Sequence, residues 1–178
     1  IISVNEGLPD FIIRSLKIDE EGKIWTGMHD KGISCYDLMQ EKFEVINEIS
    51  NWKHGSVNDL VMIGESMWIA TSGNGLVEYD VNSGKLKSIT SSKDINLNRI
   101  NSMIHDREGN TWLISNKEIF LSFGKRLEFM NSFDETTFVN IHTIYCDYEE
   151  NLWFANDKGI HHFKTEGVDS ENKLLRFP

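Results

Sequence analysis

The sequence predicts an all-β protein of the β-propeller type, a partial propeller of four four-stranded blades, and three observations support this. A polar turn that leads into a short apolar run with a Trp recurs four times, first at residues 19–25. The Trp residues of these phrases are 43, 44 and 41 residues apart. Each repeat also breaks into four short runs separated by turn residues. A period of about 40–45 residues with four strands per repeat is typical of propeller blades. The four residues are Trp25, Trp68, Trp112 and Trp153.

The first repeat, residues 9–47, shows the pattern most clearly. In residues 13–18 apolar and polar side chains alternate, with Leu16 and Ile18 on one face, which predicts a strand. Polar turns with Gly at 19–22 and 30–32 then separate this run from the next ones. The remaining strands of this repeat are predicted at residues 23–28, 33–38 and 42–47.

The other three repeats follow in the same order, and the whole chain is one array. The second, residues 57–89, has a shorter turn without the Asp. Residues 1–8 are expected to be the tail of a preceding blade, because residues 1–4 resemble the end of a strand. The predicted strands are 57–63, 67–70, 76–80 and 85–89 in the second repeat, 100–105, 111–115, 119–123 and 127–130 in the third (residues 100–130), and 141–146, 152–156, 160–164 and 173–177 in the fourth (residues 141–177).

Composition limits the partners of the chain. It carries 18 basic and 28 acidic side chains in 178 residues, a net charge of −10. Phosphate binding depends on clustered Lys and Arg, so nucleic acids and anionic membrane surfaces are not expected partners. The sequence has no apolar run of about 18 residues and no basic and apolar leader. It opens on Ile1 instead of Met, so we expect an internal piece of a longer protein.

The two cysteines, Cys35 and Cys146, stand at different positions of different repeats. Their spacing fits no metal motif, and no metal or cofactor is predicted. They are interpreted as two small buried apolar side chains. A disulfide between them remains open, because it requires the first and last repeats to approach each other.

The repeat phrases resemble the two-component regulator propeller repeat. In that family Gly-Leu-Pro precedes an apolar strand, and Asp-x-x-Gly-x-x-Trp-x-Gly leads to a Gly-rich turn and a Tyr-Asp pair. The resemblance spans about residues 7–163. Matching positions are Gly7, Leu8, Pro9, Asp10, Asp19, Gly22, Trp25, Gly27, Gly32, Ile33, Tyr36 and Asp37 in the first repeat, Trp68, Gly75, Leu76, Tyr79 and Asp80 in the second, Asp106, Gly109 and Trp112 in the third, and Asp147 and Trp153 in the fourth.

The resemblance implies a periplasmic sensory region of a membrane-bound hybrid histidine kinase, a type frequent in gut Bacteroidetes that sense glycans. Such proteins carry more repeats than the four found here, which implies that this chain is only part of a propeller. The matching residues hold a blade together, so the resemblance is more specific for the fold than for the ligand.

The recurring turn residues Asp19, Asp106 and Asp147 are predicted to be structural. An Asp in such a turn can accept hydrogen bonds from backbone N–H groups two or three residues further on. One Asp per blade also places the carboxylates far apart. The four repeat Trp residues are predicted to be core, because a large amphipathic ring fills the space between blades and can donate its indole N–H.

One aromatic residue, Trp52, stands outside the repeat register in a polar loop between the first two blades. It is either a platform for stacking a sugar or an anchor that packs on the neighbouring blade. In propellers the inter-blade loops share a face with the connections between second and third strands, where other polar residues stand. The candidate ligand-binding residues are Trp52, Lys53, His54, His29, Asn74, Arg99 and Asn116, with Asp30, Lys31, Lys117 and Asp157 on the same rim.

The histidines give no sign of catalysis or metal binding. His161 and His162 are adjacent in a predicted strand, so their side chains point to opposite faces. His105 stands at an inward position and is predicted to be a hydrogen-bonded core residue. No nucleophile elbow, zinc spacing or phosphate loop occurs, and no catalytic residue is predicted.

The sequence therefore favours a non-catalytic sensory module that binds a ligand, with an oligosaccharide as the expected one. One alternative is a protein-interaction or dimerisation scaffold, because stacked repeats form broad surfaces. Another is a propeller polysaccharide lyase or hydrolase, which would need carboxylates or His converging on one face. Self-association, or packing on neighbouring blades of a parent chain, is expected because the end blades each leave one apolar side uncovered.

Overall fold

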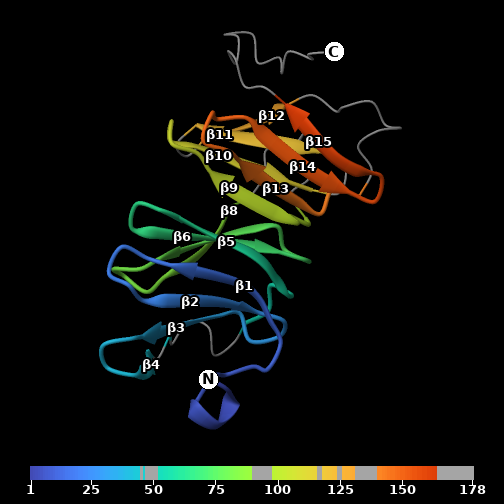
Figure 1. The fold of residues 1–178 in the computed structure, drawn as a ribbon. Helices are drawn as coiled ribbons and strands as arrows, with labels where there is room; N and C mark the ends of the chain where they lie inside the picture. Colours follow the sequence, from blue (N-terminus) through green and yellow to red (C-terminus); the bar gives the residue numbers. More distant parts are fainter. Residues whose placement is uncertain are drawn as a thin grey trace. The chain divides into compact units, whose positions relative to one another are not determined.

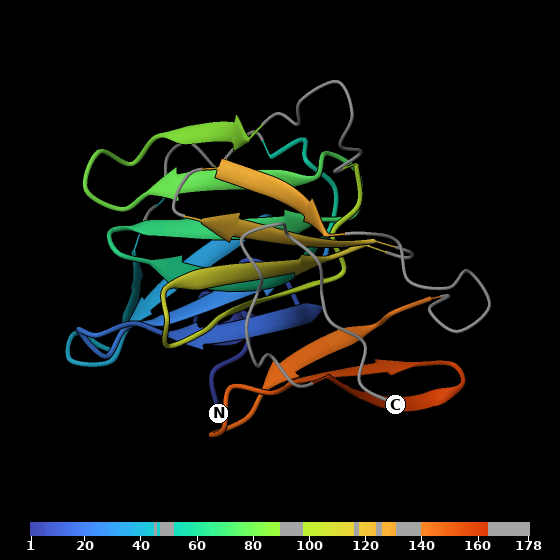
Figure 2. The ribbon, with the colours of Figure 1, turned by 90° about the horizontal axis from the view of Figure 1, so that it is seen from above.

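The computed structural model describes residues 1–44, 46, 52–89, 98–115, 118–123, 126–130 and 140–163. These residues form antiparallel sheets and one short 3-10 helix, η1 (Val4–Glu6). The chain divides into two compact units, one with strands β1–β8 and the other with β9–β15 (Figures 1 and 2).

Two four-stranded sheets make up the first unit. In each, the strands pair in chain order, so that every neighbour is joined by a simple turn or loop. Both first strands carry a register shift near their start, between Ile13 and Ser15 and between Val57 and Asp59. The strands are β1 (Ile13–Ile18), β2 (Ile24–Met28), β3 (Ile33–Asp37) and β4 (Lys42–Glu44), then β5 (Val57–Ile63), β6 (Ser66–Thr71), β7 (Leu76–Asp80) and β8 (Leu86–Ile89).

The second unit repeats this topology, and Figures 1 and 2 show its last three strands side by side. The sheet of β13–β15 has three described strands. Its fourth strand was predicted at residues 173–177, which lie outside the described residues. The strands are β9 (Ser102–His105), β10 (Asn110–Ile114), β11 (Ile119–Phe123) and β12 (Arg126–Met130), then β13 (Thr143–Cys146), β14 (Leu152–Asn156) and β15 (Gly159–Phe163). All described strand ends lie within two residues of the predicted ones, except that β4 is described only to Glu44.

The start of the chain differs from the expectation, because residues 1–4 form no strand. Ser3 caps the short helix η1. Its side chain accepts a hydrogen bond from the N–H of Asn5 at 3.2 Å, and its own N–H donates to the Glu6 carboxylate at 2.7 Å. This capping box satisfies the backbone groups locally, without a neighbouring strand.

The recurring turn Asp does accept backbone hydrogen bonds, as predicted. In the first sheet Asp19 Oδ1 accepts from the N–H groups of Glu21 at 3.0 Å and Lys23 at 2.9 Å. Its second oxygen accepts from the indole N–H of Trp25 at 2.7 Å. One carboxylate thus fixes both the turn and the orientation of the Trp ring.

The same Asp–Trp link recurs in the second unit. Asp106 accepts from the indole of Trp112 at 2.9 Å, and Asp147 accepts from that of Trp153 at 2.8 Å. The bond from Trp153, with further bonds from N–H groups of the turn, lowers the pKa of Asp147 to about 2. The sequence analysis expected only the backbone bonds, although the constant spacing of six residues between Asp and Trp was already visible.

Three of the four repeat Trp residues are buried, and the fourth is not. Trp25, Trp68 and Trp112 are buried as predicted, whereas Trp153 is 36% exposed. The ring of Trp153 stacks on His162, with centroids 4.3 Å apart, instead of entering a core cluster. The prediction of four equivalent buried positions is therefore wrong for Trp153.

His105 is also not a core residue, contrary to the prediction. It ends β9 beside a turn and is exposed. Its hydrogen-bonding capacity is nevertheless used, since Nδ1 lies 2.9 Å from Thr111 Oγ1.

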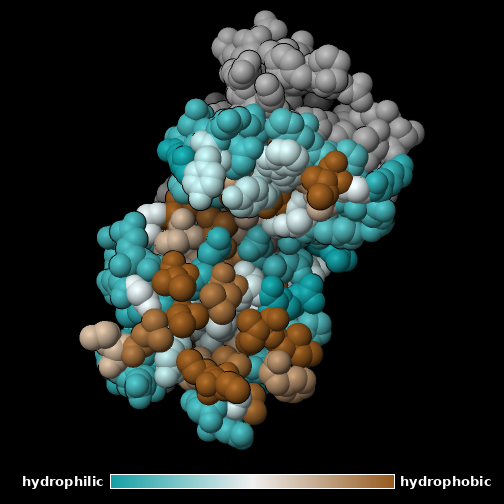
Figure 3. All heavy atoms as spheres, in the orientation of Figure 1, coloured by the Kyte–Doolittle hydropathy of each residue, from teal (hydrophilic) through white to brown (hydrophobic). Residues whose placement is uncertain are grey.

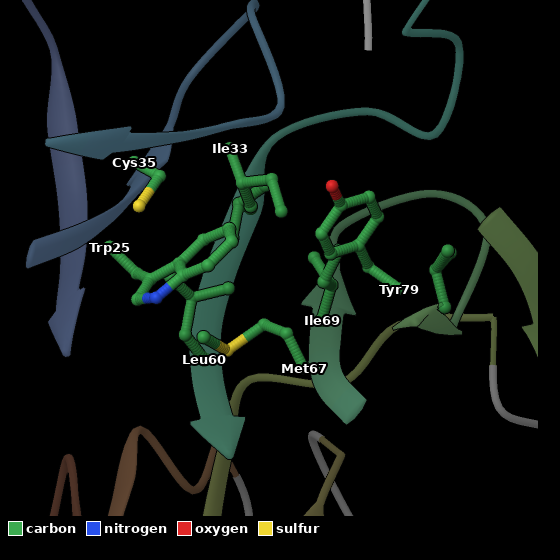
Figure 4. Close-up of a cluster of buried hydrophobic side chains, with 9 residues drawn as sticks. Trp25, Ile33, Cys35, Leu60, Met67, Ile69 and Tyr79 are labelled. Atoms are coloured by element: carbon green, nitrogen blue, oxygen red, sulfur yellow. The ribbon is translucent and has the colours of Figure 1, made fainter. Parts of the chain in front are cut away.

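A hydrophobic cluster between the two sheets of the first unit forms its core (Figure 4). Trp25, Ile33 and Cys35 from the first sheet face residues of the second sheet that include Leu60, Met67, Ile69 and Tyr79. The rings of Trp25 and Tyr79 are 5.9 Å apart and tilted by 56°. In the second unit Trp112, Ile114, Ile119 and Leu121 pack in the same way on Ile141, Ile144, Leu152 and Phe154.

Candidate functional site

The candidate rim lies in the first unit, where loops at one end of its two sheets meet. Trp52 is half-buried and packs against the core cluster of this unit. Its indole N–H donates to the carbonyl oxygen of Gly55 at 2.5 Å, within the same loop. These contacts are those of the loop anchor that the sequence analysis weighed against a sugar platform, and they leave part of the ring at the surface.

The loop of Trp52 is locked onto the connection between β6 and β7. The N–H of Ser56 donates to Ser72 Oγ at 3.0 Å, and the N–H of Ser72 donates to the carbonyl of Ser56 at 2.9 Å. The side-chain amide of Asn74 donates to the carbonyl of Lys53 at 2.9 Å. Gly55 has φ of +79°, and a Cβ there would lie 2.9 Å from Ser72 Oγ. Only Gly fits this close approach without strain.

His54 lies in the middle of this lock. Its ring meets that of Trp52 edge-on, with centroids 4.9 Å apart. Its Nδ1 is buried and has no hydrogen-bond partner in the structure, and burial lowers the pKa of the ring. Burial thus favours the neutral imidazole, because the charged form is costly in a site without a partner.

His29 joins the same rim through Ser56, with Nδ1 2.9 Å from Ser56 Oγ. Asp30 lies next to it, with 3.8 Å between Asp30 Oδ1 and His29 Nε2. The backbone N–H of Asp30 donates to the carboxylate of Asp10 at 3.0 Å. Burial alone would raise the pKa of Asp10, but hydrogen bonds from N–H groups, including that of Asp30, bring it below its usual value. Asp10 was quoted in the resemblance but not among the candidate rim residues.

Ser56, His29 and Asp30 superficially resemble a nucleophile with its base, but their geometry is unsuited to catalysis. Asp30 is too far from His29 for a hydrogen bond, and its side chain is 76% exposed. The N–H of Ser56 is bonded to Ser72, so it cannot also stabilise an oxyanion at Ser56. The rim can therefore hold a polar ligand more readily than activate one.

The structure brings only some of the predicted rim residues together. Trp52, Lys53, His54, His29 and Asn74 are joined by the contacts above. Arg99 follows Asn98, whose carbonyl accepts from the N–H of Gly75 at 3.0 Å, so Arg99 lies close to the same loops. Asn116 and Lys117 lie outside the described residues.

The second unit has a polar cluster that the sequence analysis did not assemble. Asp157 accepts from the side chain of Asn140 at 2.8 Å, and its other oxygen lies 2.6 Å from His142 Nε2. The hydrogen bond from His142 lowers the pKa of Asp157. Asp157 was noted as a rim residue, but its partners precede it by 15 and 17 residues and share no motif with it.

A shallow hollow of about 200 Å³ lies at the opposite end of the first two sheets, between their first turns. Acidic residues of both turns line it, together with Lys23, Met62 and Val81. Lys23 is paired with Glu44 at 2.9 Å and Glu21 at 3.4 Å, and its hydrogen bond to Glu44 raises its pKa. The turn between β5 and β6 is shorter than the one between β1 and β2.

Neither the histidines nor the cysteines form a metal centre among the described residues. His161 and His162 point apart, as predicted: Nε2 of His161 lies 3.1 Å from Asn156 Oδ1, whereas His162 stacks on Trp153. Cys35 and Cys146 are both free thiols, so the disulfide left open above does not form in this structure. Burial raises the pKa of Cys35 to about 12 and that of Cys146 to about 11, which makes both poor nucleophiles. Cys35 is buried as expected, and Cys146 only half-buried.

No protein-family model and no curated protein sequence matches the chain. Solved structures do match it. The extracellular domain of the candidate hybrid two-component system BT3049 from B. thetaiotaomicron aligns with a TM-score of 0.76 and 19% identity, over 96% of this chain and 24% of that one. That of the candidate hybrid two-component system BT4673 from the same organism has a TM-score of 0.70 and 24% identity, over 88% of this chain and 22% of that one. The four sheets are β-propeller blades.

A second kind of neighbour is the virginiamycin B lyase of Staphylococcus aureus, with a TM-score of 0.64 and 16% identity over 86% of this chain and 56% of that one.

The chain spans less than a quarter of the length of the two extracellular domains. Those domains belong to the kind of protein that the repeat phrases resemble. They are extracellular, which agrees with the predicted extracytoplasmic location of this chain. In the described part of the chain, no helix has the length and apolar character needed to cross a bilayer. The blades formed by β1–β4, β5–β8, β9–β12 and β13–β15 are called blades 1 to 4 below.

Proposed function

We propose that this chain is part of the extracytoplasmic sensory propeller of a two-component signalling receptor, and that it binds a ligand without transforming it. The observation that carries the proposal is the match of nearly the whole four-blade array to extracellular domains of candidate hybrid two-component systems. The lyase neighbour has a lower TM-score than either of them. Fold alone does not assign function, so the argument also depends on the site.

The side chains support a non-catalytic role. The recurring carboxylates Asp19, Asp106 and Asp147 are engaged in turns and with indole N–H groups, not directed to one face. Ser56, His29 and Asp30 lack the alignment of a nucleophile with its base. A polysaccharide lyase or hydrolase would require converging acid and base groups, which the rim of the first unit does not present.

For the ligand, we propose an oligosaccharide bound at this rim. The exposed part of Trp52 offers an apolar ring surface, and the loops that meet at the rim also carry the polar residues Asn74, Lys53, His29 and Arg99. Sugars combine apolar C–H faces with hydroxyl groups, so an aromatic ring with amide and guanidinium groups is a suitable surface for them. The lock between the loops keeps these groups in place before binding, which reduces the entropy cost of binding.

The test is a titration of the intact receptor's extracytoplasmic region with a panel of oligosaccharides, followed by indole fluorescence and calorimetry. We expect at least one oligosaccharide to bind, and Trp52→Phe and Arg99→Ala each to weaken it several-fold. Phe is chosen because it keeps the anchor in the core while losing the indole. Tyr148→Ala is the matched control, since Tyr148 is an exposed aromatic residue of blade 4.

Two results would count against the proposal in different ways. If oligosaccharides bind but both rim variants bind as the wild type does, the site lies elsewhere in the receptor. If purified receptor turns over a glycan, and substitution of one carboxylate abolishes this, the non-catalytic role is wrong.

A further inference from the structure

The loop that carries Trp52 is the counterpart in blade 2 of the segment that enters blade 1. Both β1 and β5 carry a register shift at their start. Trp52 stands five positions before β5, as Leu8 does before β1. His54 stands three positions before β5, as Asp10 does before β1. Trp52 therefore lies outside the register of the four repeat Trp residues but at a defined position of the repeat.

Backbone hydrogen bonds support this correspondence. In blade 1 the N–H of His29 donates to the carbonyl of Ile12 at 3.0 Å, and in blade 2 the N–H of Ser72 donates to that of Ser56 at 2.9 Å. His29 and Ser72 each follow the repeat Trp of their blade by four positions, and Ile12 and Ser56 each directly precede the first strand. The two entry loops are thus joined to the same connection of their blades, so their side chains can be compared position by position.

In blade 1 the entry loop serves the blade itself. Asp10 is buried, and its carboxylate accepts from the N–H of Ile12 at 3.1 Å and from that of Asp30 at 3.0 Å. Gly7 lies against the same blade, since a Cβ there would be 3.5 Å from Phe43 Cδ2. Figure 3 shows that apolar side chains gather over this sheet of β1–β4. One buried carboxylate therefore closes this end of blade 1.

Blade 2 closes the same end with other groups. The N–H of Ser56 donates to the hydroxyl of Ser72 at 3.0 Å. The side-chain amide of Asn74 donates to the carbonyl of Lys53 at 2.9 Å. These bonds join the entry loop to the connection between β6 and β7, as the carboxylate does in blade 1. The imidazole of His54 is in neither of them, so the loop is closed without it.

The contact that His54 does make is with Trp52. The two rings meet edge-on, with centroids 4.9 Å apart and planes at 62°, which is a favoured geometry for aromatic pairs. Within the described part of the chain, the buried Nδ1 of His54 has no hydrogen-bond partner. Burial lowers the pKa of the ring, which favours the neutral imidazole. A residue that served only to close the loop would be hydrogen-bonded as Asp10 is, because an unpaired buried polar atom is costly.

We propose that His54 is the positioning residue of Trp52: its ring supports one side of the indole, so that the exposed part of the indole meets a ligand at the rim in a fixed orientation. The other contacts of Trp52 are its packing on the core cluster and the bond from its N–H to the carbonyl of Gly55. His54 acts on the ligand only through Trp52. The role of Trp52 as a ligand platform rests on the proposed function, whereas the effect of His54 on the indole does not.

The first test follows the indole itself, in the extracytoplasmic region of the intact receptor labelled with fluorotryptophan. The fluorine resonance of Trp52 is identified by its loss in Trp52→Phe. His54→Ala should broaden or split this resonance and increase its shift between light and heavy water, because the indole gains other orientations and more contact with water. His54→Phe keeps a ring against the indole and should retain one resonance with the wild-type solvent shift.

The second test is calorimetry with the oligosaccharide that the titration of the receptor identifies. His54→Ala should weaken binding about three- to tenfold, the range expected when one edge-on aromatic contact is lost, whereas His54→Phe should bind within about twofold of the wild type. His105→Ala is the control, because His105 is an exposed histidine of the second unit and contacts Thr111.

Three outcomes would overturn the proposal. One is a Trp52 resonance of His54→Ala that equals that of the wild type, which would mean that the core packing and the Gly55 bond orient the indole by themselves. Another is His54→Phe being as disturbed as His54→Ala, which would assign the effect to the imidazole nitrogens. The third is a disturbed resonance with unchanged affinity, which would separate the indole from the ligand.

Failure of the proposed function gives a different result. If no oligosaccharide binds to any of the proteins, that function is wrong for this class of ligand, and the fluorine resonance still decides whether His54 positions Trp52. Circular dichroism verifies folding, and His54→Ser replaces His54→Ala if that variant is unfolded.

Discussion

A single methyl group at Gly27 is expected to destabilise the contact between blades 1 and 2. Gly27 lies on β2, two residues after Trp25, on the side that faces blade 2. A Cβ at this position would be 2.5 Å from Val57 Cγ1, 3.2 Å from Val57 Cβ and 3.3 Å from Ser15 Cβ. The equivalent positions of the other blades are Ala70, Ile114 and Ala155. The Gly is therefore required by this one contact and not by the repeat.

The size of the effect follows from how little Val57 can move. Val57 is fully buried, and its branched Cβ restricts rotation about χ1. Both residues also belong to strands, so relief must come from a shift of one sheet against the other. Overpacking costs about 1–3 kcal/mol in the free energy of unfolding, and the upper part of this range, about 2–3 kcal/mol, applies because a contact of 2.5 Å must be relieved. Replacing Gly by Ala recovers up to about 1 kcal/mol by restricting the unfolded chain, so Gly27→Ala should destabilise by about 1–2 kcal/mol.

A double-mutant cycle gives a sharper result than the single substitution. Val57→Ala alone removes two buried methyl groups and should cost about 1–3 kcal/mol. In the double variant the methyl group introduced by Gly27→Ala occupies space that the Val57 side chain has left. The two effects should then combine to less than their sum, with a coupling of at least about 1 kcal/mol.

The assay is urea unfolding of the four proteins followed by circular dichroism. Gly73→Ala is the matched control, because the nearest atom to a Cβ there is the carbonyl oxygen of His54 at 3.8 Å. If Gly27→Ala is as stable as the wild type, or if the two effects simply add, the blades are not packed as closely at this point as the structure indicates.

Two further predictions concern the turn and the rim. Asp106→Ala should lower the free energy of unfolding by about 1–3 kcal/mol, because the N–H groups of Asn110 and Trp112 lose their acceptor; Asp106→Asn keeps one oxygen and should cost less, and equal stability of all three proteins in urea would refute the link. Burial lowers the pKa of His54 below that of the unfolded chain, about 6.5. As the pH falls below that value, the unfolded state takes up the proton first, so the free energy of unfolding should decrease. His54→Gln should remove this part of the pH dependence. If the free energy of unfolding of the wild type and of His54→Gln depended on pH in the same way, the reasoning would be wrong.

Much of the fold could be predicted because each blade signals its own strands. Gly and Asp in the turns and the alternation of residues such as those of β1 are local features. Apart from β4, the ends of the described strands lie within two residues of the expectation. The burial of a side chain could not be predicted in the same way. Trp153 occupies the same repeat position as Trp25, but burial also requires a second blade on that side, which no repeat pattern within the blade can specify.

The error at His105 has a similar origin. His105, Ile18 and Cys146 occupy the same position of the repeat: each is the last residue of the first strand of its blade, next to the turn. All three are exposed or half-buried, because a strand end next to a turn is only partly covered. Alternation gives the side of the sheet to which a residue points, but not how far the neighbouring blade extends.

The rim was the least predictable part, because its contacts join loops with no common pattern. Trp52 could be singled out as an aromatic residue outside the repeat register. That its loop is locked to Ser72 and Asn74 depends on hydrogen bonds between residues 16 and 21 positions apart. The close approach at Gly55 and the unpartnered nitrogen of His54 are consequences of that lock and have no signature in the sequence.

The sensory role that we propose requires a second state, and a ligand shifts the balance between two states only by its difference in affinity for them. The blades themselves are poor candidates for the part that changes. An Asp–Trp hydrogen bond fixes the Trp ring within blade 1 and within blade 3, and a buried cluster holds each described pair of blades together. The rim loop is held by a few hydrogen bonds at its surface and contains one buried polar atom without a partner. That atom makes the locked state less stable than a fully bonded one would be. Opening of this loop would expose His54 and free the carbonyl of Lys53. A ligand that binds either of these groups would favour the open state. A ligand that stacks on Trp52 in its present position would favour the locked state. The direction of the change in His54 exchange or titration on ligand binding therefore distinguishes these two modes of sensing.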